Sequence, residues 1–150
     1  MDSIRRVDLQ KGPLAGQAGS DGWGQELRTG LQEHGFVKVV GHEVSADLVL
    51  RAQDAFRRFF ELPEHAKNLC GGVSGGQRGF TPLGLEHARD QQAPDQKEFF
   101  HVGQEDPPPH PKNGTYPGNV WPESVPDLQG AALDLYSRLE ETAGILLQGL

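Results

Sequence analysis

The clearest hydrophobic pattern lies at the end of the chain, where leucines recur at helical spacing. Steps of 7, 4, 7 and 4 positions separate Leu128, Leu135, Leu139, Leu146 and Leu150. This spacing places them along one side of an α-helix. Residues 124–127 (Ser-Val-Pro-Asp) have the form of a capping box with proline in the first turn. The pattern predicts a helix from Val125 of about 26 residues, roughly 39 Å long.

Two further helices are predicted nearer the N-terminus. Ser45 is a good N-cap for a helix that ends near Phe60, and its apolar face is formed by Leu48, Ala52, Ala55 and Phe59. Pro63 opens a short helical turn after it. A helix over 25–34 is followed by Gly35, the residue type that favours the C′ position.

Four short segments have the composition of strands. They are rich in β-branched and aromatic residues or in alternating apolar residues, and they are Ile4–Leu9, Phe36–Val40, Gly79–Thr81 and Lys97–Val102. Between and after them, 20 glycines and 11 prolines indicate long irregular connections. Short strands with three helices of unequal length predict an α+β fold.

The final helix carries a broad apolar face that the rest of the chain can hardly cover. We therefore expect that further chain follows residue 150, or that another chain covers this face. The alternative is that it packs on the helix over 45–60.

Charge and composition exclude several classes of function. The net charge is −7 and no basic block is present, which argues against a nucleic-acid partner. No apolar run is long enough for a membrane span, and the first residues lack the apolar core of a signal peptide. A single cysteine, Cys70, excludes an internal disulfide and fits a cytoplasmic protein best.

Six short strings, in order along the chain, resemble the N-terminal region of the isopenicillin N synthase-like iron(II)/2-oxoglutarate-dependent oxygenases. They are residues 4–9 (I-x-x-V-D-L), 34–44 (H-G-F-V-K-V-V-G-H-E-V), 59–67 (F-F-E-L-P-E-H-A-K), 79–80 (G-F), 95–99 (D-Q-K-E-F) and 119–122 (N-V-W-P). The resemblance implies a non-haem dioxygenase N-terminal domain over 1–150. It also implies that the final helix lies along the outside of a double-stranded β-helix barrel, and that the strands join its major sheet.

The resemblance implies Fe(II) and 2-oxoglutarate as cofactors of the intact enzyme. Members of the family bind the metal with H-x-[D/E] and a distant second histidine. None of the six histidines here is followed two positions later by an acid, and no Arg-x-Ser clamp for 2-oxoglutarate occurs. Both motifs belong to the second half of family members. We therefore expect no catalytic residue, no metal ligand and no activity in residues 1–150 alone.

Arg78 and Phe80 are the candidate substrate-binding residues. They match an R-G-Y segment that borders the active-site mouth in the family, with Phe in place of Tyr. The ring is kept, but the hydroxyl donor is lost. Arg78 retains a guanidinium that suits a carboxylate. The alternative for each is a surface arginine and a packing aromatic.

Three other features are interpreted as structural. His87 and Asp90 are three positions apart, as a metal pair on a helix would be, but no third ligand lies near. Cys70 has no histidine partner in the sequence that would make it a nucleophile. Asn119 and Trp121, within N-V-W-P, are interpreted as a brace for the entry to the final helix.

The leading hypothesis is the N-terminal portion of a dioxygenase that acts on a small organic substrate. In it, the chain supports a barrel that lies in cis or in a separately encoded partner chain, and it lines the pocket mouth. The alternative is a free-standing, non-catalytic module that binds a partner through the Leu128–Leu150 helix.

Overall fold

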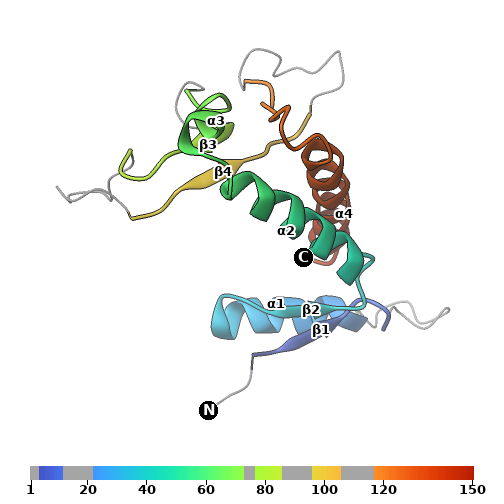
Figure 1. The fold of residues 1–150 in the computed structure, drawn as a ribbon. Coiled ribbons are helices and arrows are strands. Elements are labelled where there is room, and N and C mark those ends of the chain that lie inside the picture. The colour runs from blue at the N-terminus through green and yellow to red at the C-terminus, as the bar shows by residue number, and fades with distance from the viewer. Residues whose placement is uncertain (1–3, 12–21, 73–76, 86–95, 106–116) are drawn as a thin grey trace. The chain divides into compact units, whose positions relative to one another are not determined.

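The computed structural model describes residues 4–11, 22–72, 77–85, 96–105 and 117–150. These residues form a mixed helix and strand structure without a closed barrel (Figure 1). The elements in chain order are β1 (Arg6–Asp8), α1 (Gly22–His34), β2 (Lys38–Val40), α2 (Ala46–Phe60), α3 (Glu64–Asn68), β3 (Gly79–Thr81), β4 (Phe99–His101) and α4 (Leu128–Gln148). They divide into a first unit, residues 1–46 with 135–150, and a second unit, residues 47–134.

In the first unit, β1 and β2 form a parallel pair in which Val7 lies opposite Val39. Both strands lie inside the segments predicted from the sequence. Gly30 of α1 allows the helix to approach them closely, because a Cβ there would lie 2.4 Å from Val37 Cγ1. Gly35 ends the helix with a positive φ of 76° and donates from its N–H to Leu31 O at 2.9 Å. This confirms the predicted C′ glycine.

The last turn of α4 packs against α1 in the same unit. The carbonyl of Gly149 accepts a hydrogen bond of 2.7 Å from Arg28 Nη1. A Cβ at position 149 would lie 2.1 Å from Trp23 Cζ3, so the indole lies directly on the glycine. The end of the helix therefore has a partner within the chain, which the leucine pattern alone does not predict.

In the second unit, α2 buries the predicted face, Leu48, Ala52, Ala55 and Phe59. Phe59 is fully buried at the centre of an aromatic cluster. Its ring meets Phe100 of β4 and Phe80 of β3 edge-on, with ring centroids 4.9 Å and 5.7 Å apart. Phe100 in turn stacks on Trp121, with ring centroids 6.4 Å apart. Edge-to-face contacts of this kind add to the energy of burial. The cluster joins α2 to both strands of the hairpin.

α4 begins three residues later than predicted, at Leu128. Residues before it form two turns, with Val125 N–H bonded to Pro122 O and Leu128 N–H to Val125 O. Pro126 has no N–H to continue an α-helical ladder backward. The first helical bond runs from Ala131 N–H to Asp127 O at 3.0 Å. Asp127, rather than Ser124, therefore occupies the N-cap position, and the helix has 21 residues.

Most of the apolar face of α4 is uncovered within the described residues. Only Leu128, Ala131 and Ala132 are buried in this helix. Three leucines farther along expose half or more of their area: Leu139 (52%), Leu147 (70%) and Leu150 (59%). Among the described helices, none combines the length and apolar character that a bilayer crossing requires.

Candidate functional site

The predicted substrate-binding residues lie at the start of the β3–β4 hairpin, in the second unit. β3 pairs antiparallel with β4, so that Gly79 faces His101 and Phe80 faces Phe100. Gly79 has a positive φ of 74°, and a Cβ on it would lie 2.1 Å from Cys70 O. Phe80 N–H donates to the same carbonyl at 2.9 Å. Only glycine fits this close turn, which fixes the direction in which the chain leaves Arg78.

The guanidinium of Arg78 lies against the backbone of Gly103, just past the end of β4. An added Cβ at Gly103 would stand 2.0 Å from Arg78 Cζ, 2.1 Å from Nη2 and 2.4 Å from Nε. Arg78 Nη1 donates to Gln77 O at 2.7 Å. Arg78 is half-buried, and its Nε is the buried part. The absence of a side chain at position 103 is therefore what makes room for the guanidinium.

Asn119 holds Gly103 in place through both of its backbone groups. Gly103 N–H donates to Asn119 Oδ1 at 2.8 Å, and Asn119 Nδ2 donates to Gly103 O at 2.8 Å. The amide thus pairs with the backbone as a neighbouring strand would. Asn119 Nδ2 also lies 3.5 Å from Glu105 Oε1. Asn119 therefore fixes the backbone segment against which the Arg78 guanidinium lies.

Phe80 lies in the aromatic core of the second unit, only 2% exposed. Lys67 Nζ stands 5.2 Å from its ring centroid and donates to Glu98 Oε2 at 2.6 Å. Lys67 is itself buried. The ring therefore packs between α2 and a partly buried ion pair, and contact with a substrate at Phe80 stays a prediction.

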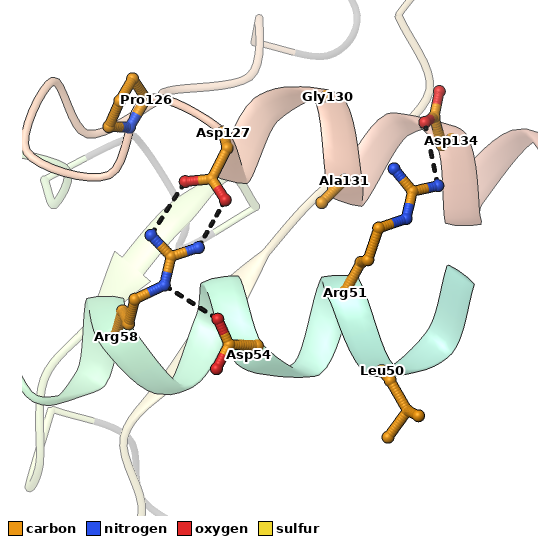
Figure 2. Close-up of a pocket in the computed structure, with 9 residues that line it drawn as sticks. All are labelled: Leu50, Arg51, Asp54, Arg58, Pro126, Asp127, Gly130, Ala131 and Asp134. Carbon is orange, nitrogen blue, oxygen red and sulfur yellow. Dashed lines mark hydrogen bonds and ion pairs between the residues drawn. The ribbon is translucent and has the colours of Figure 1, made fainter. Parts of the chain in front are cut away.

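A groove of about 570 Å³ runs between α2 and the first turns of α4 (Figure 2). Arg58 forms a bidentate pair with Asp127, and Arg51 Nη2 lies 3.6 Å from Asp134 Oδ2. Arg51 lies seven residues before Arg58, and Asp134 lies seven residues after Asp127. The two pairs therefore form an ion-pair ladder between antiparallel segments. Asp54 accepts from Arg58 Nε at 3.0 Å inside it.

The ladder shifts the titration of its carboxylates. Hydrogen bonds from Arg57 and then Arg58 lower the pKa of Asp54, and the hydrogen bond from Arg58 lowers the pKa of Asp127. Both carboxylates are exposed, and each is paired with arginine: Asp54 with Arg57 and Arg58, and Asp127 with Arg58. The groove is thus explained by helix pairing, with no chemistry required.

A second hollow, of about 580 Å³, lies beside the aromatic cluster. It is lined by Ala66, Leu69, Cys70, Trp121, Pro122, Glu123 and Ser124. Burial raises the pKa of the Cys70 thiol, which keeps it protonated and unreactive at neutral pH.

Within the described ranges, no three His, Cys, Asp or Glu side chains are grouped so as to hold a metal ion. The His87 and Asp90 pair lies outside those ranges. The donor set for iron that the family resemblance implies is therefore not formed by the part of the chain that the structure describes.

Residues 4–124 match the family described as non-haem dioxygenase in morphine synthesis N-terminal. The match covers most of the chain, so the chain belongs to this family of N-terminal regions. The predicted resemblance to iron(II)/2-oxoglutarate oxygenases is thereby confirmed.

Named relatives agree with this assignment. The chain is 33% identical over 110 residues to the 2-oxoglutarate-Fe(II) type oxidoreductase hxnY of Emericella nidulans, covering 70% of this chain and 32% of the relative. It is 28% identical to a Validamycin A dioxygenase of Streptomyces hygroscopicus subsp. limoneus, covering 99% of this chain and 42% of the relative. The chain thus spans a third to two fifths of these relatives.

Solved structures show the same relationship. A putative 2OG-Fe(II) oxygenase family protein of Caulobacter crescentus superposes with a TM-score of 0.83 at 29% identity, over 99% of this chain and 48% of that one. A full-length protein of Neurospora crassa, solved in complex with alpha-KG, superposes with a TM-score of 0.73 at 21% identity, over 97% and 47%. The second likeness supports the fold alone.

The sequence marks Arg78 as a candidate, and its role in substrate binding stays a prediction; the sequence does not mark the residues that contact it. The N-V-W-P string marks Asn119 as a brace for the final helix, and the structure places its amide on Gly103. Gly103 follows directly on a predicted strand, and glycine at such a position is a recognised sign of close backbone approach. That signal is present in the sequence.

Proposed function

We propose that this chain is the N-terminal region of a non-haem iron(II)/2-oxoglutarate-dependent dioxygenase that acts on a small organic substrate. In this proposal residues 1–150 form one N-terminal domain, and the catalytic barrel is supplied by chain beyond residue 150 or by a separately encoded partner. The observation that carries the proposal is the family match over 4–124, combined with relatives about two to three times as long.

The chain's role in the proposal is architectural. The uncovered leucines of α4 and the open parallel pair β1–β2 are surfaces of the kind that a barrel would cover. Parallel strands are normally covered on both faces, and a two-stranded sheet alone is marginal. Both features support a docking role for this chain.

Iron and 2-oxoglutarate would be held by the barrel. The sequence contains neither H-x-[D/E] nor Arg-x-Ser, and the described residues do not group ligands for a metal. Arg78 and Phe80 are the residues through which we propose that this chain reaches the pocket mouth. Arg78 is the better supported of the two, because Phe80 is almost fully buried.

The exposed face of α4 also suits the second candidate, a non-catalytic module that binds a partner through Leu128–Leu150. The two candidates differ in the gene product. The intact mass of the native protein, detected in its source cells with an antibody against this chain, separates them. The dioxygenase proposal predicts either a mass at least about twice the 16.4 kDa of this chain or a co-purifying barrel-forming partner, in each case with consumption of 2-oxoglutarate dependent on Fe(II). A product of 16.4 kDa without a barrel-forming partner contradicts it.

A further inference from the structure

We propose that the hollow between the end of α3 and the segment that leads into α4 binds a small organic ammonium ion with an apolar body. The hollow lies within the second unit and has a volume of about 580 Å³. This volume is in the range of small-molecule sites. The inference goes beyond the proposed function, because it does not depend on iron, on 2-oxoglutarate or on a substrate pocket.

The apolar part of the hollow is formed chiefly by Leu69 and Trp121. Leu69 is 82% exposed, although it lines a hollow beside a buried aromatic cluster. Trp121 is partly exposed, and its indole is supported by Phe100, whose ring plane lies 27° from its own. An exposed leucine beside a fixed indole gains free energy when an apolar group covers both. The hollow therefore suits a ligand with a hydrocarbon body.

Glu123 gives the hollow its charge. Among the described residues that line the hollow, Glu123 is the one charged side chain. It is exposed, and within the described part of the chain no cation pairs with its carboxylate. In the groove between α2 and α4, by contrast, Asp54, Asp127 and Asp134 are each paired with arginine. A carboxylate beside an indole favours an ammonium ion, because both groups attract a cation.

Cys70 reports on the hollow, because it lines the hollow while being only 2% exposed. A ligand that fills the hollow blocks the approach of a thiol reagent. The test uses the full-length gene product and iodoacetamide at mildly alkaline pH, with alkylation of Cys70 followed by peptide mass spectrometry. Free cysteine in the same mixture corrects for reagent that the ligand consumes. The three ligands share one phenylethyl body: 2-phenylethylammonium, the neutral 2-phenylethanol and the anionic 3-phenylpropanoate.

We expect the ammonium to slow alkylation of Cys70 at millimolar concentration, as a ligand of about nine non-hydrogen atoms allows. The alcohol should need a roughly two- to fivefold higher concentration, since an exposed ion pair adds little, and the acid should protect least. Glu123→Gln should reduce the ammonium to the level of the alcohol. Trp121→Phe should weaken protection by both. The matched control is Glu64→Gln, an exposed acid of α3 outside the hollow, which should change nothing.

Two results contradict the choice of a cation: equal protection by the ammonium and the alcohol, or an unchanged preference in Glu123→Gln. An absence of protection by all three ligands overturns the site itself. Because Glu123 is exposed, Glu123→Gln keeps the test available if Trp121→Phe does not fold. Failure of the proposed function appears separately, as the absence of 2-oxoglutarate consumption by the wild-type product.

Discussion

Arg58 of α2 and Asp127 at the start of α4 face each other through the two terminal guanidinium nitrogens and both carboxylate oxygens, with Nη1 3.0 Å from Oδ1. Seven residues away on each helix, Arg51 and Asp134 repeat the pairing at 3.6 Å. The two pairs set the register between the helices. Because the groups are exposed, we expect the ladder to select this register more than to stabilise the fold.

The ladder predicts a loss of stability in acid. The pKa of Asp127 is held below its ordinary value of 3.8 by the hydrogen bond from Arg58, so the folded state binds the proton less readily than the unfolded state. Its contribution is present above pH 3.8 and is lost as the pH falls through the lower, folded-state pKa. Asp127→Asn should lower the urea midpoint slightly at pH 7, and this difference from the wild type should shrink as the pH falls below 3.8, so that the variant shows a flatter acid decline. An unchanged acid profile in this variant would show that the pair is not formed in solution.

Loss of the Lys67–Glu98 ion pair is expected to lower the stability of the fold more than loss of the exposed Arg58–Asp127 pair, because Lys67 is buried. Glu98→Gln leaves the Lys67 charge without its counter-ion beside the ring of Phe80. We expect a loss of about 3 kcal/mol in the free energy of unfolding. Adding Lys67→Met should recover most of it, since no unpaired charge then remains. The exposed Arg57→Gln is the control and should leave the urea midpoint nearly unchanged. Equal effects for Glu98→Gln and this control would show that the Lys67–Glu98 pair does not stabilise the fold.

Two glycines predict opposite results on substitution by alanine. Gly79→Ala places a Cβ against Cys70 O at a positive φ and should cost roughly 1–3 kcal/mol or more. Gly130 lies in α4 with nothing within 4 Å of an added Cβ. Gly130→Ala should therefore stabilise the protein by up to about 1 kcal/mol, through helix propensity. Thermal unfolding of the two variants measures both changes in stability. Destabilisation by Gly130→Ala would contradict the open space at this position of α4.

Cys70 is expected to be inert in the native protein. It is 2% exposed, and burial raises the pKa of its thiol above the ordinary value of 9.0. At pH 8, iodoacetamide should modify it much more slowly than free cysteine and at the ordinary rate in urea. Since it is the chain's one cysteine, mass spectrometry of the intact chain reports the reaction directly. Rapid modification of the native protein would mean that the hollow beside Trp121 opens in solution.

Local patterns predict the elements well. The spacing of Leu48, Ala52, Ala55 and Phe59 indicates the buried face of α2, and Gly35 indicates the end of α1, because both depend on neighbours within one or two turns. The same patterns place the start of α4 too early, because a proline in a first turn and a proline in the turn before it look alike in sequence.

The contacts that build the site are not predictable in the same way. Asn119 meets Gly103 across 16 residues, and Lys67 meets Glu98 across 31. Such pairs depend on how irregular segments cross, which no periodicity records. The family resemblance supplies Arg78 as a candidate, but only the structure shows how it is held.

The most direct test of the account is anaerobic titration of Fe(II) and 2-oxoglutarate into purified residues 1–150 and, in parallel, into the full-length gene product, followed by calorimetry. The account predicts stoichiometric binding of both by the full-length product and no specific binding by residues 1–150. Tight, stoichiometric binding of iron by residues 1–150 would contradict the claim that this chain supports the dioxygenase site without forming it.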